Sequence, residues 1–213
     1  MHAELEPLGL SIIAVAIDEN PAAVRPWVDE AGATFPVIVD RDYAIAEHFN
    51  INNVPTVVWI DEHDRIVRPN DVAFASDLFK DFHGIDSSPH HDALRRWVVD
   101  GELELDDEAV RRHQVLPTDD QQRARLEYRL AVELHRRGRD EAAAPHFDRA
   151  GELAPLDFTI RRASLPLRGI DPFVSDEFFT LYGEWEQAGA VYYGLSEITD
   201  RAGPDSDDPT PVP

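Results

Sequence analysis

The residues of this chain that could do chemistry are limited by the absence of cysteine. None of the 213 residues is a cysteine, so disulfides, thiol catalysis and cysteine-ligated zinc are excluded within this sequence. Among the nine histidines, His83, His90 and His91 share one aspartate-rich stretch, and such ligands bind zinc or iron. Adjacent histidines, however, point to different sides of a helix. We therefore expect solvated histidines, no metal site and no cofactor.

Charge and hydropathy narrow the classes of partner further. The formal net charge is −22, whereas binding to nucleic acid or to an anionic membrane needs clustered lysine and arginine. The sequence also shows no nucleophile elbow, no glycine-rich phosphate loop, no signal peptide and no apolar run approaching the roughly 20 residues of a membrane span. These features predict a cytoplasmic protein that binds neither nucleic acid nor membrane.

The elements that would position functional residues alternate between strand and helix. The run from Leu10 to Ile17 is continuously apolar and β-branched, which is typical of a strand buried in a parallel sheet. Asn20 can cap a following helix whose first residue is Pro21. Strands are predicted at 10–17, 35–39 and 54–60, helices at 21–32 and 43–49, and a hairpin whose turn at 61–64 leads to a strand at 65–67. This alternation predicts an α/β domain.

The second half of the chain is predicted to be helical. A helix capped at Ser87–Ser88 and stopping near Gly101 would close the first domain, 1–101, and a polar connector would cover 102–120. In the helical region, 121–200, a helix is expected at 121–137, where apolar residues recur at helical spacing at Leu126, Leu130 and Leu134. Further helices are expected at 140–153 and 175–186, a disordered tail at 201–213, and core positions for Trp27, Trp59 and Trp97.

Several spaced segments together resemble one known family. They are IIAVAIDEN, TFPVIVD, RDYAIAEHFN and NINNVPTVVWIDEHDRIVR, in that order. Residues 10–67 thus resemble the second half of a redoxin of the TlpA/ResA type, in the thioredoxin-like superfamily. The resemblance implies a thioredoxin-like sheet with flanking helices, incomplete at its N-terminus. It also implies thiol-disulfide oxidoreductase or peroxide reductase activity on a protein thiol or a peroxide.

The same resemblance assigns roles to a few residues. It implies a cis peptide bond between Val54 and Pro55 and a substrate groove formed by Val54, Pro55 and Thr56. The alternative is that Pro55 simply begins a strand, where proline is tolerated. Glu19, after the first strand, is the candidate proton relay, because buried carboxylates can have raised pKa values. The alternative is that Glu19 only favours the N-terminus of the next helix.

One part of the family pattern is missing. The W-x-x-C-x-x-C-type motif, in which a helix N-terminus activates a thiol, should lie just before residue 1. We therefore expect Met1 to be an internal methionine, the catalytic cysteine or selenocysteine to lie upstream, and the chain as written to be inactive. The missing strand would be central, and its loss would leave buried backbone groups unpaired. The alternative function is a redox-inactive thioredoxin-like module that binds proteins.

A second resemblance concerns the helical region, whose spacing is similar to a tetratricopeptide repeat. The matching residues are Leu130, Ala131, Leu134, Gly138, Ala143, Phe147, Ala150 and Pro155. One repeat cannot bury its apolar face alone, so it should pack on the first domain, on a later helix or on another subunit. The resemblance implies a protein partner or a homodimer, and the alternative is a generic helical hairpin.

Overall fold

The computed structural model describes residues 1–18, 20–71, 77, 80 and 86–188. These residues group into two compact units, each described here by itself. The discontinuous unit combines His2–Val54 with the helices that follow Val115, and the hairpin unit is built on Pro55–Gln114. The division does not follow the predicted boundary at 101, and the predicted domain limits stay a prediction.

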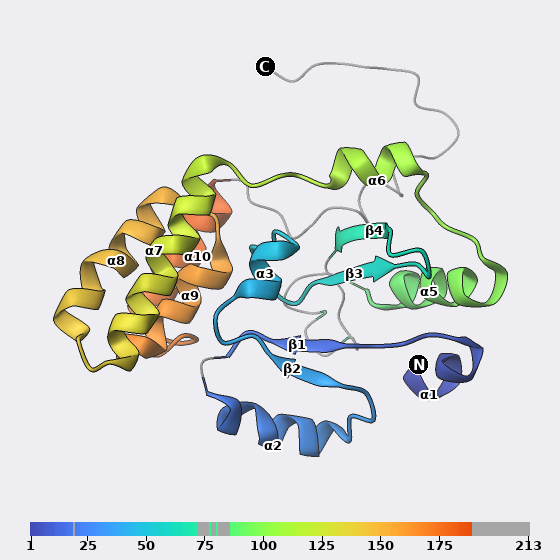
Figure 1. Cartoon of the computed structure of the whole chain (residues 1–213), viewed down its shortest axis with the longest axis horizontal. Coiled ribbons are helices and arrows are strands. Elements are labelled where there is room, and N and C mark those ends of the chain that lie inside the picture. The colour runs from blue at the N-terminus through green and yellow to red at the C-terminus, as the bar shows by residue number, and fades with distance from the viewer. Residues whose placement is uncertain (19, 72–76, 78–79, 81–85, 189–213) are drawn as a thin grey trace. The chain divides into compact units, whose positions relative to one another are not determined.

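The first part of the discontinuous unit contains the predicted strand–helix alternation. Its elements are α1 (His2–Leu5), η1 (Glu6–Leu8), β1 (Ala14–Ala16), α2 (Pro21–Ala31), β2 (Val37–Val39) and α3 (Ala44–His48) (Figure 1). β1 and β2 are parallel, with Ala14 opposite Val37. The Asn20 side chain accepts a hydrogen bond from the N–H of Ala22, and Gly32 ends α2 with a φ of 58°. The predicted cap and stop of α2 are therefore confirmed, while both strands are shorter than predicted.

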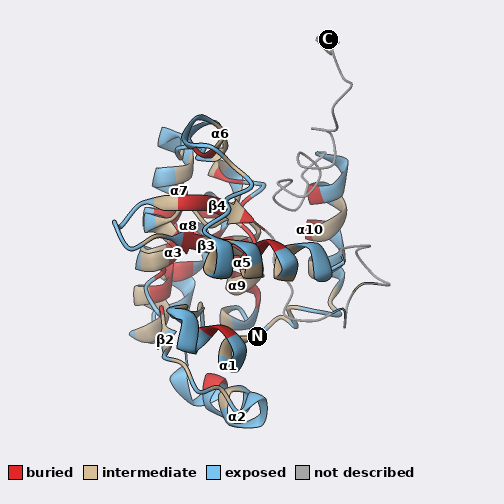
Figure 2. Cartoon of the chain, turned by 90° about the vertical axis from the view of Figure 1, so that its right-hand side faces the viewer, coloured by how far each residue is buried: buried red, intermediate tan, exposed pale blue. Residues whose placement is uncertain are grey.

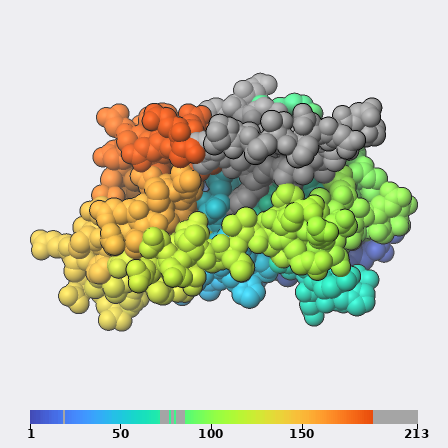
Figure 3. All heavy atoms as spheres, turned by 90° about the horizontal axis from the view of Figure 1, so that it is seen from above, coloured from blue at the N-terminus to red at the C-terminus, as the bar shows by residue number. Residues whose placement is uncertain are grey.

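Four helices form the second part of the same unit. They are α7 (Asp119–Arg136), α8 (Asp140–Leu153), α9 (Phe158–Leu167) and α10 (Asp176–Gln187). Thr118 and Gln121 form a reciprocal capping box at the start of α7, and Gly138, with a φ of 67°, separates α7 from α8. Figure 3 shows the atoms of these helices as one contiguous mass, from yellow-green to deep orange. Helix α9 was not among the helices predicted from the sequence.

The core of this unit lies on a different face of α7 from the predicted one. Leu126 and Leu130 are 57% and 44% exposed, so these two leucines of the predicted apolar face lie outside the core, whereas Leu134 packs against it. The buried face instead carries Ala124, Tyr128, Ala131 and Val132. The ring of Tyr128 lies 4.9 Å from that of Tyr43, which precedes α3. Buried residues of α3, α7 and α8 belong to one hydrophobic cluster, and Figure 2 colours the buried residues of the chain red.

The sequence left open where the α7–α8 pair buries its apolar face, and the packing within this unit shows it. Ala46 of α3 belongs to the same buried cluster as Phe147 and Ala150 of α8 and Ile160 of α9, and Ile17 and Ile51 pack against it. The α7–α8 pair therefore buries its apolar face against both the first part of the unit and α9. Its similarity to a tetratricopeptide repeat stays a prediction.

The described residues of the hairpin unit form an antiparallel strand pair and two helices. β3 (Val57–Ile60) and β4 (Ile66–Asp71) confirm the predicted hairpin, and α5 (Ser88–Asp100) and α6 (Asp107–His113) follow. The Asp61 carboxylate accepts hydrogen bonds from the N–H groups of His63 and Arg65 and so closes the turn. Contrary to expectation, the Ser87 side chain makes no capping hydrogen bond to α5. The 102–120 stretch, predicted to be only a polar connector, contains α6.

The tryptophans divide between core and surface. In the hairpin unit, Trp59 is buried and its ring stacks on that of Trp97, with a centroid distance of 5.2 Å. In the discontinuous unit, Trp27 is 73% exposed on α2, so its predicted core position is wrong. Only Val24 of α2 is fully buried, because this helix covers a sheet of just two strands.

The four strands form two separate two-stranded sheets, β1–β2 and β3–β4, and within the described ranges no ladder joins β1 to β3. The α/β class with a following helical region is thus confirmed. In the part of the chain that the structure describes, no helix combines the length and apolar character needed to cross a membrane. The cytoplasmic location stays a prediction, and the tail at 201–213 lies outside the described residues.

Candidate functional site

The residues predicted to form a substrate groove lie where the chain passes from one unit to the other. Val54 is the last residue of the discontinuous unit, and Pro55 and Thr56 begin the hairpin unit. The N–H of Val54 donates to Oδ1 of Asn53 at 2.9 Å. All three residues precede β3, which begins at Val57, so the strand predicted from residue 54 starts later. Their role as a groove stays a prediction.

The other predicted functional residue, Glu19, falls outside the described residues. The next residue, Asn20, caps α2, so Glu19 directly precedes the N-cap of that helix. This position is compatible with the alternative in which Glu19 only favours the N-terminus of α2. The role of Glu19 as a proton relay therefore stays a prediction.

Helix α3, which precedes Val54, is fixed at its start by one carboxylate. Asp40 is buried, and its two oxygens accept hydrogen bonds from the N–H groups of Ala44, Ile45 and Ala46 at 2.9, 2.9 and 3.0 Å. These groups would otherwise lack partners, since the first N–H groups of a helix have none within it. Asp40 directly follows β2, so the strand places the helix.

Tyr43 ties α3 to the end of β1. It adopts a left-handed backbone conformation with a φ of 57°, and its hydroxyl donates to the carbonyl oxygen of Ile17 at 3.1 Å. Burial raises the pKa of the Tyr43 hydroxyl well above its usual value, so this group stays a neutral donor. The ring lies against Tyr128 of α7. A single side chain thus connects the sheet, α3 and the helical region.

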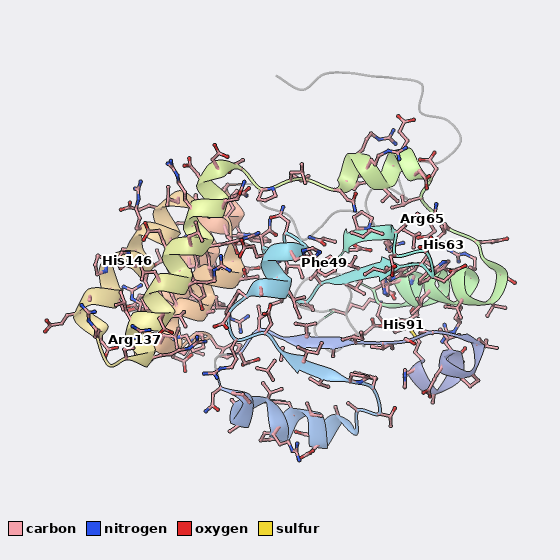
Figure 4. The ribbon with its side chains drawn as sticks, viewed as in Figure 1. Phe49, His63, Arg65, His91, Arg137 and His146 are labelled. Atoms are coloured by element: carbon pink, nitrogen blue, oxygen red, sulfur yellow. The ribbon has the colours of Figure 1, made fainter. Side chains whose placement is uncertain are left out.

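The loop 50–53 follows α3 and leads directly to Val54. The N–H of Ile51 donates to the carbonyl oxygen of Ala46 at 2.8 Å, and Asn50 has a φ of 50°. The side-chain amide of Asn50 donates to the carbonyl oxygen of Val115 at 2.7 Å. Phe49, at the end of α3, is labelled in Figure 4. The loop has irregular backbone, so contacts from outside it fix its path.

An arginine of α7 supplies part of these contacts. The side chain of Arg125 is 5% exposed, and its guanidinium donates to the carbonyl oxygen of Glu47 at 3.3 Å and to Oδ1 of Asn50 at 2.8 Å. Two further arginines of α7 form surface ion pairs with residues of α3 or just before it, Arg129 with Glu47 and Arg136 with Asp42. Sequence reasoning missed Arg125; the available signal was an arginine between Ala124 and Tyr128, on the small-and-aromatic face of the helix.

The start of α9 holds the loop from another direction. The N–H groups of Phe158 and Thr159 donate to the carbonyl oxygen of Asn52 at 2.8 and 3.2 Å. Asp157 caps α9 by accepting from the N–H of Ile160, and its Oδ2 lies 3.5 Å from Nε of Arg125. Burial raises the pKa of the Asp157 carboxyl, against the lowering effects of its Thr159 hydrogen bond and of Arg125.

The hairpin unit contains a buried charged cluster around Arg68. Its guanidinium donates to Oδ2 of Asp71 at 2.8 Å and to Oε2 of Glu104 at 2.6 Å, and it lies over the ring of Trp59. The hydroxyl of Thr56 donates to the carbonyl oxygen of Asp71 at 3.1 Å, so this predicted groove residue is anchored beside the cluster.

The histidines do not form a metal site in the described part of the chain, where no group of three or more potential metal ligands occurs. His83 lies outside the described residues. His90 is largely buried against Trp59, with a ring distance of 5.3 Å, so its expected solvation is wrong. Burial, with Arg68 and His91 nearby, lowers the pKa of His90 to about 4. Figure 4 shows His91 on α5 and His63 in the hairpin turn.

Comparison with known proteins identifies relatives of the first part of the chain. Residues 1–84 match the model of the Redoxin family. Over 82 residues the chain is 28% identical to the thiol-disulfide oxidoreductase ResA of Halalkalibacterium halodurans, which covers 38% of this chain and 47% of that protein. The ResA of Geobacillus kaustophilus is 30% identical over 67 residues, covering 30% and 38%, and that of Bacillus subtilis is 28% identical over 60 residues, covering 28% and 34%.

The chain spans less than half the length of each of these relatives. No solved structure matches the chain. The 213 residues contain no cysteine, so the side chains described above cannot themselves exchange a disulfide.

Proposed function

We propose that this chain, whose residues 1–84 belong to the redoxin family, supplies the substrate-binding part of a TlpA/ResA-type thiol-disulfide oxidoreductase or peroxide reductase. The observation that carries the proposal is the match of residues 1–84 to the Redoxin model together with the run of ResA relatives over the same segment. Its substrate class, a protein disulfide, a protein thiol or a peroxide, follows from the family.

The redox-active residue of the proposed enzyme is a cysteine or selenocysteine that is not among these 213 residues. In disulfide exchange its thiolate or selenolate attacks one sulfur of a substrate disulfide, forms a mixed disulfide or selenenylsulfide, and releases the other sulfur as a thiolate. Val54, Pro55 and Thr56 would shape the groove in which the substrate backbone lies. Glu19 would relay the proton that the leaving thiolate takes up.

Genomic sequence tests where the redox residue lies. We expect the DNA upstream of the Met1 codon, read in frame over about 250 bases, to encode a W-x-x-Cys or a W-x-x-UGA motif, since the missing part of a domain of this size has that length. A frame closed by stop codons, with no such motif, would contradict the upstream position of the catalytic residue and leave the binding-module alternative.

An activity assay on the 213-residue chain provides a second test. Reduction of insulin by dithiothreitol should proceed at the uncatalysed rate, because the chain offers no thiolate. The matched control is the longer protein containing the motif, which should accelerate the reaction. Catalysis by the 213-residue chain would show that the chemistry does not need the absent residue.

A second candidate function is a redox-inactive module that binds proteins. The observation in its favour is that the 213-residue sequence has no cysteine, while loop 50–53 is held in place by α7 and α9. Such a module would use the Val54–Pro55 segment to hold an extended peptide and would have no turnover. The helical region would add a protein partner or a homodimer contact.

A further inference from the structure

We propose that α7 and α9 act as a positioning clamp on loop 50–53, and that Arg125 is the positioning residue through which the helical region controls the backbone of Val54. The inference rests on the proposed function, because Val54 matters only if it belongs to a substrate groove. It assigns the helical region a role within the redoxin site.

The loop lacks regular structure of its own and is held from outside. Its carbonyl at Asn52 accepts the first two N–H groups of α9, from Phe158 and Thr159. The first N–H groups of a helix need partners from outside the helix, so α9 and the loop satisfy each other. The next residue, Asn53, is buried and its side chain receives the N–H of Val54. A shift of α9 would therefore move Asn52 and, through Asn53, the backbone of Val54.

Arg125 connects all three elements at one guanidinium. It donates to the carbonyl oxygen of Glu47 at the end of α3 and to the side chain of Asn50 in the loop, and its Nε lies 3.5 Å from Asp157 at the start of α9. A planar, permanently charged fork can serve several acceptors at fixed angles, which lysine or glutamine cannot do. Because the group is buried, its hydrogen bonds are not exchanged for water, and their loss leaves unsatisfied partners.

The neighbouring arginines of α7 make a matched control. Arg129 pairs with the Glu47 carboxylate at 2.9 Å, and both side chains are about one-third exposed. This surface pair joins the same two helices, α7 and α3, through the side chain of Glu47. Exposed ion pairs contribute little to stability. Arg129→Gln therefore removes the same charge from α7 but at an exposed pair instead of a buried one.

Hydrogen exchange on the whole chain tests the clamp. We expect Arg125→Gln to speed exchange of the amides of Ile51, Val54, Phe158 and Thr159 by about tenfold or more, since local opening free energies set exchange rates. Amides inside α8 and α5 should be unchanged. The double variant Arg125→Gln/Asp157→Asn removes both members of the buried pair, so it leaves no unpaired buried charge that could unfold the chain. It should show the same pattern of exchange. Arg129→Gln should match the unsubstituted chain.

Two results would overturn the proposal: no change at these four amides, or an equal acceleration throughout α7, α8 and α9. A separate titration with reduced, alkylated insulin B chain reports the groove itself through the amide signal of Val54. We expect binding to the unsubstituted chain and affinity lowered about fivefold or more in Arg125→Gln, because a misplaced loop presents its backbone less often. Absence of binding to the unsubstituted chain would contradict the proposed groove, while the exchange data would still decide the clamp.

Discussion

The side chain of Asp40 caps the start of α3 with three hydrogen bonds. Its carboxylate receives three N–H groups at the start of a helix of only five residues, Ala44–His48, and it directly follows β2. A helix this short has little stability of its own, because fixing the backbone of the first turn costs more free energy than its few hydrogen bonds contribute. The path of the chain toward Val54 therefore depends on this one capping side chain.

Replacing Asp40 tests that dependence. Asp40→Ala should lower the free energy of unfolding by about 2 kcal/mol, the upper part of the range for capping residues, because three N–H groups at the start of α3 lose their acceptor. Urea unfolding followed by circular dichroism measures the change. Asp42→Ala is the control, since Asp42 is exposed and pairs with Arg136 at the surface, and it should cost well under about 1 kcal/mol. Equal effects would show that the cap is not the reason.

His90 gives the hairpin unit a defined dependence on pH. Burial lowers its pKa from 6.5 to about 4, so the folded state prefers the neutral ring and protonation favours unfolding. Protonation of the unfolded chain therefore begins to lower stability as the pH falls below 6.5, and the loss grows until about pH 4, where the folded state is protonated too. The lowered pKa values of Asp61 and Asp86, about 2 each, act below their ordinary value of 3.8 and so outside this window.

His90→Phe separates this contribution from all others. Phenylalanine keeps a ring against Trp59 but cannot take up a proton. Between about pH 7 and about pH 5 the unsubstituted chain should lose about 2 kcal/mol more unfolding free energy than the variant. Urea unfolding at the two pH values, detected by tryptophan fluorescence, gives the difference. An identical pH dependence in both chains would mean that His90 titrates normally.

At the scale of elements, the buried face of α7 decides how the helical region attaches. Tyr128 contacts both Tyr43 and Phe147, at ring distances of 4.9 and 5.9 Å, and is almost completely buried. Small residues beside it, Ala124 and Ala131, let the neighbouring elements approach. Leu126 and Leu130 face outward and Leu134 is only partly buried against the cluster, so the attachment centres on Tyr128 and the alanines beside it.

A pair of truncations on α7 checks this assignment. Tyr128→Ala should cost about 3–5 kcal/mol, in the range for emptying a buried aromatic site. Leu130→Ala, two residues away and 44% exposed, should cost less than about 1 kcal/mol. Denaturant unfolding of both variants measures the ratio. A larger loss for Leu130→Ala would support the leucine face predicted from the sequence.

At the scale of the whole molecule, charge is the dominant feature. A formal net charge of −22 on 213 residues repels itself in any compact state, and salt screens that repulsion. Local pairs such as Arg68 with Glu104 or Arg136 with Asp42 offset only part of it. The stability of the folded chain should therefore depend on ionic strength.

Thermal unfolding in salt tests this dependence. Raising KCl from about 0.1 M to about 1 M should raise the melting temperature by about 5 °C, because screening relieves repulsion at these concentrations. The same titration near pH 4.6, the isoelectric point of the sequence, is the control and should show a much smaller shift. A melting temperature that falls with salt at neutral pH would indicate that specific ion pairs outweigh the repulsion.

Much of the secondary structure was predictable because its signals are local. Asn20 and Gly32 delimit α2, Gly101 ends α5, and α8 has the predicted bounds. Capping side chains and left-handed glycines act on their own neighbours, so a linear sequence contains the information. Helix α9 was missed because its sequence, FTIRRASLPL, has no clear apolar period and carries a proline.

The amino-acid sequence by itself determined the redoxin resemblance, the α/β alternation, the lack of a thiol and the strong negative charge. Only the tertiary structure decided which face of α7 is buried, that Trp27 is exposed and His90 is not, and that Arg125 and α9 hold the loop before Val54. The physical reason is that burial and buried hydrogen bonds join residues such as Asn50 and Arg125, which lie far apart in the chain. Local patterns contain no record of such partners.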